Sequence, residues 1–145
     1  MSVKRVYVPE VDLTSPDDSV QLAARRMSDR KVGSLVACNA LGHPVGILTD
    51  RDLALRVVAA GRDPNATTVA EVMTREPECV NEDASVESAI GTMRATSCRR
   101  LPVVDDQQRL VGVVALDDIL GLLSEEFREI GALLWKESPN SMSPS

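Results

Sequence analysis

The sequence contains an internal repeat with a constant offset of 66 residues, and a tandem repeat constrains the fold more strongly than any other feature. Residues 15–54 align with residues 81–120 without a gap. Nine of the forty aligned positions are identical, where composition alone gives about two or three. These positions, each with its partner 66 residues later, are Asp17, Ser19, Val20, Ala23, Met27, Leu35, Val45, Gly46 and Asp52. Two packed copies create a cleft between them, where function should be sought.

The length and composition indicate one small globular unit with an aliphatic core. The chain has 145 residues, about one domain's worth, and a copy of roughly sixty residues is marginal alone, so the copies should share a core. Tyr7, Phe127 and Trp135 are the only aromatic residues, so aliphatic side chains and methionine must fill that core. The formal net charge of −6 argues against broad electrostatic binding to nucleic acid or anionic lipid.

Neither a secretory signal nor a membrane span is expected. Residues 1–5 lead into no apolar segment of the kind found in signal peptides. The longest uninterrupted apolar stretch, Leu110 to Leu116, is too short to cross a bilayer. We therefore expect a soluble cytoplasmic protein.

The cysteines do not have the spacing of a metal site. Cys38, Cys79 and Cys98 are irregularly spaced, and His43 is the single histidine, so no zinc site is expected. We interpret the three thiols as small buried hydrophobic groups. A disulfide between the copies, with a redox role, is kept as an alternative.

Each copy has the pattern of strand, helix, strand, strand, helix. In the first copy, a short strand at 11–13 precedes a helix of about ten residues that begins after Ser19. Strands at 35–38 and 45–48 flank a hairpin loop, and a second helix runs from Thr49 to Gly61. In the second copy, strands are expected near 79–80, at 101–104 and at 110–114, with helices at 85–95 and from about 116 to Trp135.

This pattern divides the chain into four parts. We assign residues 6–66 to the first repeat, 67–75 to a connecting helix or linker, and 76–136 to the second repeat. Residues 137–145 are rich in serine and proline and are predicted to be a disordered tail.

The segment from Gly46 to Asp52 has the composition of an anion site. A strand ends and a helix begins at Thr49, which brings together a hydroxyl, free N–H groups and the positive end of a helix dipole. Gly46 permits close approach of a ligand or another chain, and Asp52 suits a pair of ribose hydroxyls. The alternative is that Thr49 and Asp52 merely cap the helix.

The two copies differ at the residues that carry this chemistry. Ala115 replaces Thr49, whereas Asp118 retains the carboxylate of Asp52. Arg99 and Arg100 stand where the first copy has residues 33–34, a Gly-Ser pair. If the copies pack about a pseudo-twofold axis, the arginines would face the Thr49 region and bind an anion there. The alternative is that they form an ordinary solvated edge.

Three stretches, together with the duplication, resemble a known family. They are residues 71–74 (Glu-Val-Met-Thr), residues 99–105 (Arg-Arg-Leu-Pro-Val-Val-Asp) and Gly46-x-x-Thr49-x-x-Asp52. Roughly residues 6–125 resemble a cystathionine β-synthase (CBS) domain pair, or Bateman module. The resemblance implies an α/β (α+β) fold of tandem β-α-β-β-α repeats, packed through their sheets with pseudo-twofold symmetry. It also implies a cleft that holds an adenosine nucleotide, and a disc-like homodimer.

The resemblance also assigns roles to individual residues by position. It implies that Thr49 and Arg51 lie near phosphate and that Asp52 holds the ribose. Arg99 and Arg100 match a basic position that reaches phosphate. The base pocket is expected at Leu13, Thr14 and Ser15. Because Asp118 alone survives in the other half of the cleft, we predict one competent site and one weak or empty site.

The resulting hypothesis is a non-enzymatic regulatory protein that senses an adenosine nucleotide and acts through a protein effector that the sequence does not identify. The expected ligand is AMP, ADP or ATP, with NAD or S-adenosylmethionine as alternatives. A second hypothesis is a structural dimerisation module whose cleft stays empty, and a third is the redox variant described above. Catalysis by His43 and Cys98 ranks last, because no third orienting residue is evident.

Overall fold

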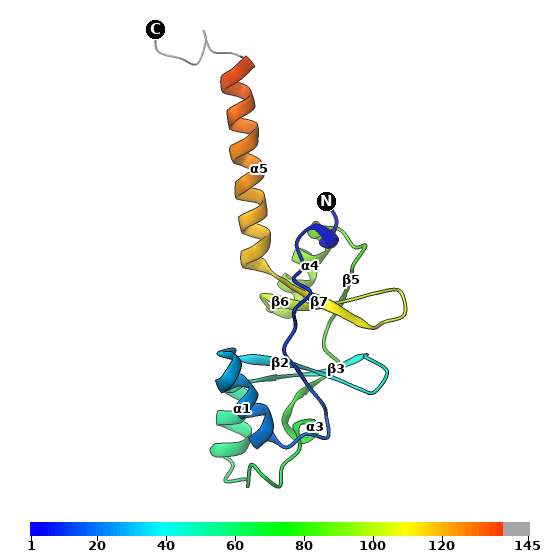
Figure 1. The fold of residues 1–145 in the computed structure, drawn as a ribbon, viewed down its shortest axis with the longest axis vertical. Coiled ribbons are helices and arrows are strands. Elements are labelled where there is room, and N and C mark those ends of the chain that lie inside the picture. The colour runs from blue at the N-terminus through cyan, green and yellow to red at the C-terminus, as the bar shows by residue number, and fades with distance from the viewer. Residues whose placement is uncertain (138–145) are drawn as a thin grey trace.

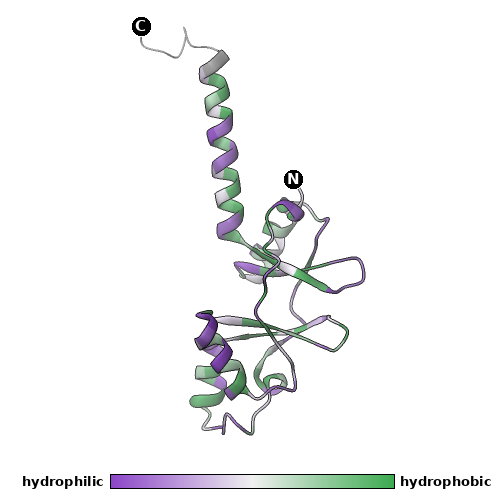
Figure 2. Cartoon of the chain, in the orientation of Figure 1, coloured by the Kyte–Doolittle hydropathy of each residue, from purple (hydrophilic) through white to green (hydrophobic). Residues whose placement is uncertain are grey.

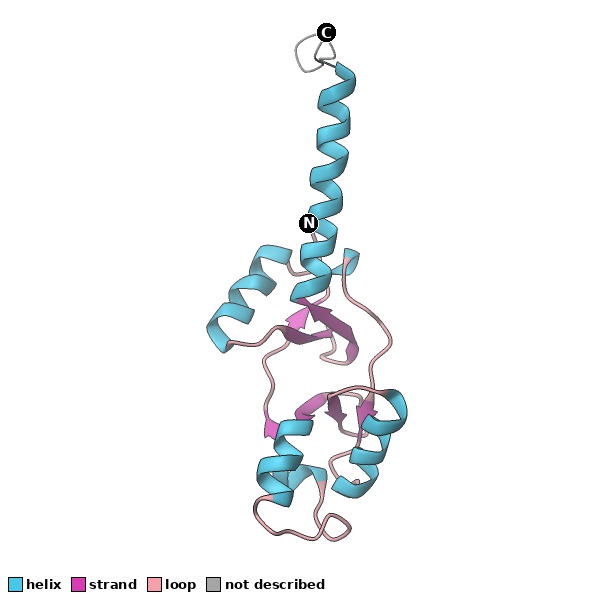
Figure 3. Cartoon of the chain, turned by 90° about the vertical axis from the view of Figure 1, so that its left-hand side faces the viewer, coloured by secondary structure: helices cyan, strands magenta, loops and turns pink. Residues whose placement is uncertain are grey.

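The computed structural model describes residues 1–137, in which each copy forms its own sheet with helices on one face. The first sheet has the order β1 (Leu13–Thr14), β2 (Ser34–Cys38), β3 (Pro44–Thr49) and β4 (Thr74–Arg75). The second has the order β5 (Val80–Asn81), β6 (Arg100–Val104) and β7 (Leu110–Ala115). Figure 3 shows the two sheets facing each other with the helices outside. The predicted fold, with tandem repeats packed through their sheets, is confirmed.

The pairing of strands is the same in both sheets. The first strand of each copy pairs in parallel with the second, and the second pairs antiparallel with the third. Registers match at the offset of 66, since Leu35 pairs with Leu48 and Leu101 pairs with Val114. The two sheets are therefore built on one plan, as the repeat in the sequence predicts.

Equivalent serines begin the long helices that cover the sheets, α1 (Val20–Arg30) and α4 (Val86–Thr96). The side chains of Ser19 and Ser85 accept hydrogen bonds from backbone N–H groups in the first turn of each helix. The remaining helical segments are the 3₁₀ turn Val3–Arg5, α2 (Asp50–Leu53), the π-helical turn Ala54–Val58, α3 (Val69–Val72) and α5 (Leu116–Glu137).

The second helix of the first copy is not the continuous α-helix that we expected from Thr49 to Gly61. After α2 the chain widens into a π-helical turn, in which the Ala59 N–H donates to the Ala54 carbonyl at 2.9 Å. The extra residue in this turn keeps Val57 in the core, 3% exposed, and leaves Leu55 and Val58 in solvent. Apolar spacing alone could not distinguish this turn from an α-helix, because both bury residues on one side.

Each copy is completed by a segment from elsewhere in the chain. The Val3 N–H donates to the Ala84 carbonyl at 2.9 Å, and the Val69 N–H donates to the Asp18 carbonyl at 2.8 Å. Residues 1–8 thus pack on the second copy, while residues 67–75 pack on the first, as the N-terminal trace in Figure 1 shows. These segments are also related by the offset of 66, so the repeat extends beyond the aligned forty residues. These segments link the two copies, but each copy has its own hydrophobic core, so the expectation of one shared core is wrong.

Two glycines allow these added segments to lie against the central strands. A Cβ atom on Gly46 would overlap the sulfur of Met73, and one on Gly112 would overlap the ring of Tyr7. The close approach expected at Gly46 is therefore made by the protein's own chain.

The helix α5 extends well beyond the second sheet, as Figures 1 and 3 show. Its continuation to Trp135 was predicted from the sequence and is confirmed. Figure 2 shows apolar residues along its whole length, and several are exposed, among them Phe127, 76% exposed. No helix in residues 1–137 is both long enough and apolar enough to cross a membrane. Of the predicted tail, residues 138–145 lie outside the described residues.

Candidate functional site

The larger of two described cavities lies between the two copies and has a volume of about 360 Å³. Its walls come from both sheets and from the segment that leads into β1. The lining residues are Val8, Glu10, Val11, Asp12, Val32, Ser34, Val36, Ile47, Arg100, Leu101, Pro102, Val113, Ala115, Asp117 and Asp118. A ligand in this cavity would contact both repeats at once.

Strand ends and a helix start bring the polar groups of the cavity together. Arg100 begins β6 and pairs in register with Ala115, the last residue of β7. Asp117 and Asp118 follow in the first turn of α5. Ser34, at the position equivalent to Arg100, enters from the start of β2. The cavity therefore holds a guanidinium, a hydroxyl and carboxylates within apolar walls.

Some of these charged groups are already paired. Asp12 accepts a hydrogen bond from Arg30 at 2.8 Å, and Asp117 accepts one from Arg99 at 2.9 Å. Within the described residues, the side chains of Glu10, Arg100 and Asp118 make no hydrogen bond or ion pair. These three side chains are exposed and are available to a ligand.

Thr49 and Asp52 form a reciprocal capping box instead of facing a described cavity. The Thr49 hydroxyl accepts from the Asp52 N–H at 3.1 Å, and the Asp52 carboxylate accepts from the Thr49 N–H at 2.9 Å. Asp52 also lies 3.9 Å from Arg56 and is only 14% exposed. Neither residue lines either described cavity, nor do Arg51 and Gly46. The capping alternative is realised, and the ligand role of these residues stays a prediction.

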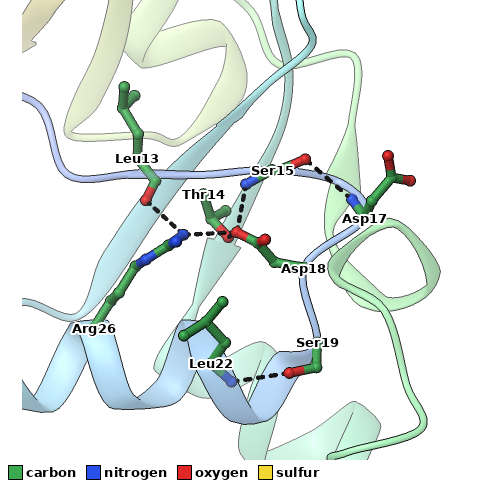
Figure 4. A network of polar contacts seen from close by, with 8 residues as sticks. All are labelled: Leu13, Thr14, Ser15, Asp17, Asp18, Ser19, Leu22 and Arg26. Carbon is green, nitrogen blue, oxygen red and sulfur yellow. Dashed lines mark hydrogen bonds and ion pairs between the residues drawn. The ribbon is translucent and has the colours of Figure 1, made fainter.

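The predicted base-pocket residues are held by a polar network, drawn in Figure 4. One carboxylate oxygen of Asp18 accepts from the Thr14 hydroxyl at 3.0 Å, the Ser15 N–H at 2.9 Å and Arg26 at 2.6 Å. Arg26 also donates to the Leu13 carbonyl at 3.3 Å. Thr14 is 4% exposed, and none of the three predicted residues lines the cavity. They instead fix the end of the segment from which Val11 and Asp12 do line it.

The network lowers the pKa of Asp18 and exists in the first copy alone. Burial by itself would raise this pKa, but the hydrogen bonds from Ser15, Arg26 and Thr14 outweigh burial and hold the pKa below its ordinary value. The second copy has Val80, Ala84 and Thr92 at the positions of Thr14, Asp18 and Arg26, and these side chains cannot form it. Only the segment beside the cavity is reinforced in this way.

The two arginines do not act as a pair. Arg99 is engaged with Asp117 of its own copy, whereas Arg100 lines the cavity with Ala115 and Asp118. The cavity thus combines Arg100 with the carboxylate that the sequence assigned to the weaker half of the cleft. The assignment of one competent and one weak half of the cleft stays a prediction.

Four polar lining residues were missed by sequence reasoning: Glu10, Asp12, Ser34 and Asp117. The repeat held a signal for two of them, because Ser34 is equivalent to Arg100, and Asp117 is equivalent to Arg51. Glu10 and Asp12 precede the aligned forty residues, and only the fold brings them to the cavity.

The three thiols differ in how far they are buried. Cys38 and Cys79 are half-buried, and burial raises the pKa of both, that of Cys79 to about 11. Cys98 is exposed, so the interpretation of all three thiols as buried groups is wrong for this residue. In the part of the chain that the structure describes, no three His, Cys, Asp or Glu side chains gather closely enough to hold a metal ion.

Comparison with known proteins identifies the family. The model of the CBS domain matches the chain twice, at residues 3–59 and 69–125. The chain belongs to the CBS-domain family. Both matches begin within the interchanged segments, at Val3 and Val69, which fits the extended repeat seen in the structure.

Two curated proteins are similar along most of this chain. The CBS domain-containing protein YhcV of Bacillus subtilis is 43% identical over 118 residues, covering 81% of this chain and 82% of that protein. The uncharacterised protein MK0525 of Methanopyrus kandleri is 36% identical over 120 residues, which are 83% of this chain but only 61% of that protein. This chain therefore spans less than two thirds of the latter relative.

Solved structures share the fold. Hypoxic Response Protein I, crystallised with two coordinated zinc ions, superposes with a TM-score of 0.75 at 30% identity, covering 83% of this chain and 97% of that one. The CBS domain pair of protein MJ0100, in complex with 5′-methylthioadenosine and S-adenosylmethionine, gives a TM-score of 0.74 at 28% identity, covering 87% and 98%.

Proposed function

We propose that this protein is a non-catalytic regulatory module that binds an adenosine-type ligand in the cavity between its repeats. The observation that carries this proposal is a cavity lined by both copies that contains charged groups without partners in the described residues, among them Arg100 and Asp118. The complex of the similar MJ0100 domain pair with adenosine-type ligands supports this proposal.

The chemistry of the cavity suits a nucleoside. The Asp118 carboxylate has free acceptor positions for two ribose hydroxyls, and Arg100 can donate to a further polar group of the ligand. The apolar side chains of Val36, Ile47 and Val113 offer surface for a base. A volume of about 360 Å³ is at the lower end of the roughly 300–1,000 Å³ of ligand pockets. This size favours one nucleoside unit over a dinucleotide such as NAD.

We place the ligand at Asp118 and not at Asp52, the reverse of the ranking made from sequence. Asp52 would have to give up its bond to the Thr49 N–H and its place beside Arg56 to bind a ribose. Asp118 makes no such bond in the described residues and already lines a cavity. We therefore assign Thr49 a capping role in this proposal.

A ligand can transmit a signal because both repeats contribute walls to the cavity. A ligand that contacts β2 and β3 of one copy and β6 and β7 of the other stabilises one arrangement of the two sheets. A protein effector that recognises this arrangement would receive the signal. We propose that this function is carried out in the cytoplasm.

A thermal-shift experiment tests the binding site. Wild-type protein, Asp118→Asn and the control Asp29→Asn are melted with and without adenosine, AMP, 5′-methylthioadenosine and S-adenosylmethionine. Asp29 is exposed on α1, away from the cavity lining. A ligand at a hundredfold excess over its Kd adds about 2.7 kcal/mol of stability. We expect this gain in the wild type and the control and its loss in Asp118→Asn. No shift with any compound would favour the empty-cleft dimerisation module.

We also propose that the protein forms a homodimer through α5. Leu120, Leu123, Phe127, Ile130 and Leu134 follow a heptad spacing along this helix. Among the flanking positions of this stripe, only Glu126 carries a charge, and Arg5 neutralises it at 3.1 Å. A second copy of the same helix can therefore pack on the stripe without repulsion between like charges. A hexameric CBS-CP12 protein is among the structural neighbours, with a TM-score of 0.69 at 27% identity.

Light scattering after size-exclusion chromatography tests this interface. We expect the mass of two chains for the wild type and of one chain for the double variant Phe127→Glu, Ile130→Glu. Glu125→Lys, on the opposite face of α5, is the control and should keep the dimer. A dimer that survives the double substitution would refute pairing through α5.

A further inference from the structure

We propose that the cavity discriminates among adenosine ligands by charge, so that it accepts a neutral or cationic group on the adenosine and disfavours a polyphosphate. This inference rests on the proposed function, because it concerns the same cavity. Its basis is the set of charges that the fold brings together there.

Carboxylates outnumber cations on the cavity lining. Four acidic side chains reach it, those of Glu10, Asp12, Asp117 and Asp118, against the single guanidinium of Arg100. Arg30 offsets Asp12, and Arg99 offsets Asp117. Two carboxylates and one cation remain without partners in the described residues. A triphosphate with about four negative charges would therefore meet more repulsion than attraction.

The start of α5 offers an anion little compensation. Ala115 has no hydroxyl to donate to a phosphate, and the first N–H of the helix, that of Leu116, already donates to the Arg99 carbonyl at 2.8 Å. Asp117 and Asp118 place two negative charges in the first turn. These charges already complement the positive end of the helix dipole, so an anionic ligand gains less there.

A cationic ligand meets the opposite balance. A sulfonium or ammonium group placed near Glu10 is attracted electrostatically to a carboxylate that has no partner in the described residues. A thioether meets neither repulsion nor attraction and can pack against the apolar wall. The expected order of affinity is S-adenosylmethionine, then 5′-methylthioadenosine, then AMP, then ATP.

Isothermal titration calorimetry with these four compounds, in buffer containing EDTA, tests the order. We expect ATP to bind at least tenfold more weakly than 5′-methylthioadenosine, with the difference shrinking as salt screens the charges. Glu10→Gln should narrow the difference, because Glu10 is exposed and has no described partner to lose. The matched control is Glu87→Gln, which lies on the outer helix α4 and outside the cavity lining. This control should leave the difference in affinity between ATP and 5′-methylthioadenosine unchanged.

The outcomes separate the two proposals. If ATP binds as tightly as 5′-methylthioadenosine, or if Glu10→Gln leaves the ratio unchanged, charge selection is wrong while adenosine binding stands. If no compound binds, both proposals fail. If each compound binds Asp118→Asn with the same affinity as it binds the wild type, the ligand occupies another site.

Discussion

Thr49 and Asp52 each accept a hydrogen bond from the backbone N–H of the other, at 3.1 and 2.9 Å. The second copy keeps the aspartate as Asp118 but has Ala115 in place of the threonine. The repeated carboxylate caps a helix in one copy, whereas in the other it lines a cavity and makes no hydrogen bond within residues 1–137. This difference underlies our choice of binding site.

Removing the Thr49 hydroxyl should affect stability but not binding. We expect Thr49→Ala to lower the free energy of unfolding by about 1 kcal/mol, the usual cost of losing an N-cap. Urea denaturation measures this loss, and calorimetry should show unchanged ligand affinity at matched fraction folded. A large loss of affinity would instead indicate that the ligand binds in the half of the cleft that contains Thr49.

Asp18 should make stability sensitive to acid. Its pKa in the folded protein lies below its ordinary value of 3.8, so its contribution is complete above that value and is lost as pH falls through the lowered folded-state pKa. Asp18→Asn should reduce stability near neutral pH and flatten the acid limb of the stability curve. Urea midpoints between pH 2.5 and 7 test this, with Asp29→Asn as a surface control. If the stability of Asp18→Asn falls with decreasing pH as steeply as that of the wild type, the proposed role of Asp18 is wrong.

Glycine at 46 and 112 should be required for packing. Alanine at either position would overlap Met73 or Tyr7, and overpacking of this kind costs about 1–3 kcal/mol. Gly91 lies within α4 with open space around it, so Gly91→Ala should raise stability by about 0.5–1 kcal/mol. Thermal melting of the three variants provides the comparison, and neutral behaviour of Gly46→Ala would show that Met73 moves freely.

An added cation should change ligand preference. Ser34 lines the cavity at the position equivalent to Arg100, so Ser34→Arg would place a second guanidinium there. We expect AMP and ATP to bind at least tenfold more tightly than to the wild type, measured by calorimetry. Ser34→Gln controls for size, and an equal gain with this variant would exclude charge as the cause.

The thiols should differ in reactivity. A pKa of about 11 leaves roughly one Cys79 thiol in a thousand ionised at pH 8, whereas Cys98 is exposed. We expect a disulfide exchange reagent to modify Cys98 rapidly and Cys79 slowly. Melting with and without reductant should give the same midpoint, and a higher midpoint without reductant would support the redox alternative.

The sequence predicted the fold because the fold depends on local and repeated patterns. Ser19 and Ser85 cap equivalent helices, and the strands that follow pair in equivalent registers. The π-helical turn at residues 54–58 was not predicted, because one extra residue in a turn depends on how Val57 meets the core. The place of residues 1–8 was missed because nothing local shows which sheet a terminal segment joins.

The sequence by itself determined that two copies share one plan and that they diverge at Thr49 and Ala115. Only the tertiary structure decided which residues meet in the cleft. It brought Glu10 and Asp12 beside Asp118 and Arg100, and it turned Thr49 and Asp52 toward each other. The physical reason is that the spacing of residues within a copy determines its helices and strands. A cavity between copies instead depends on side chains that are distant in sequence.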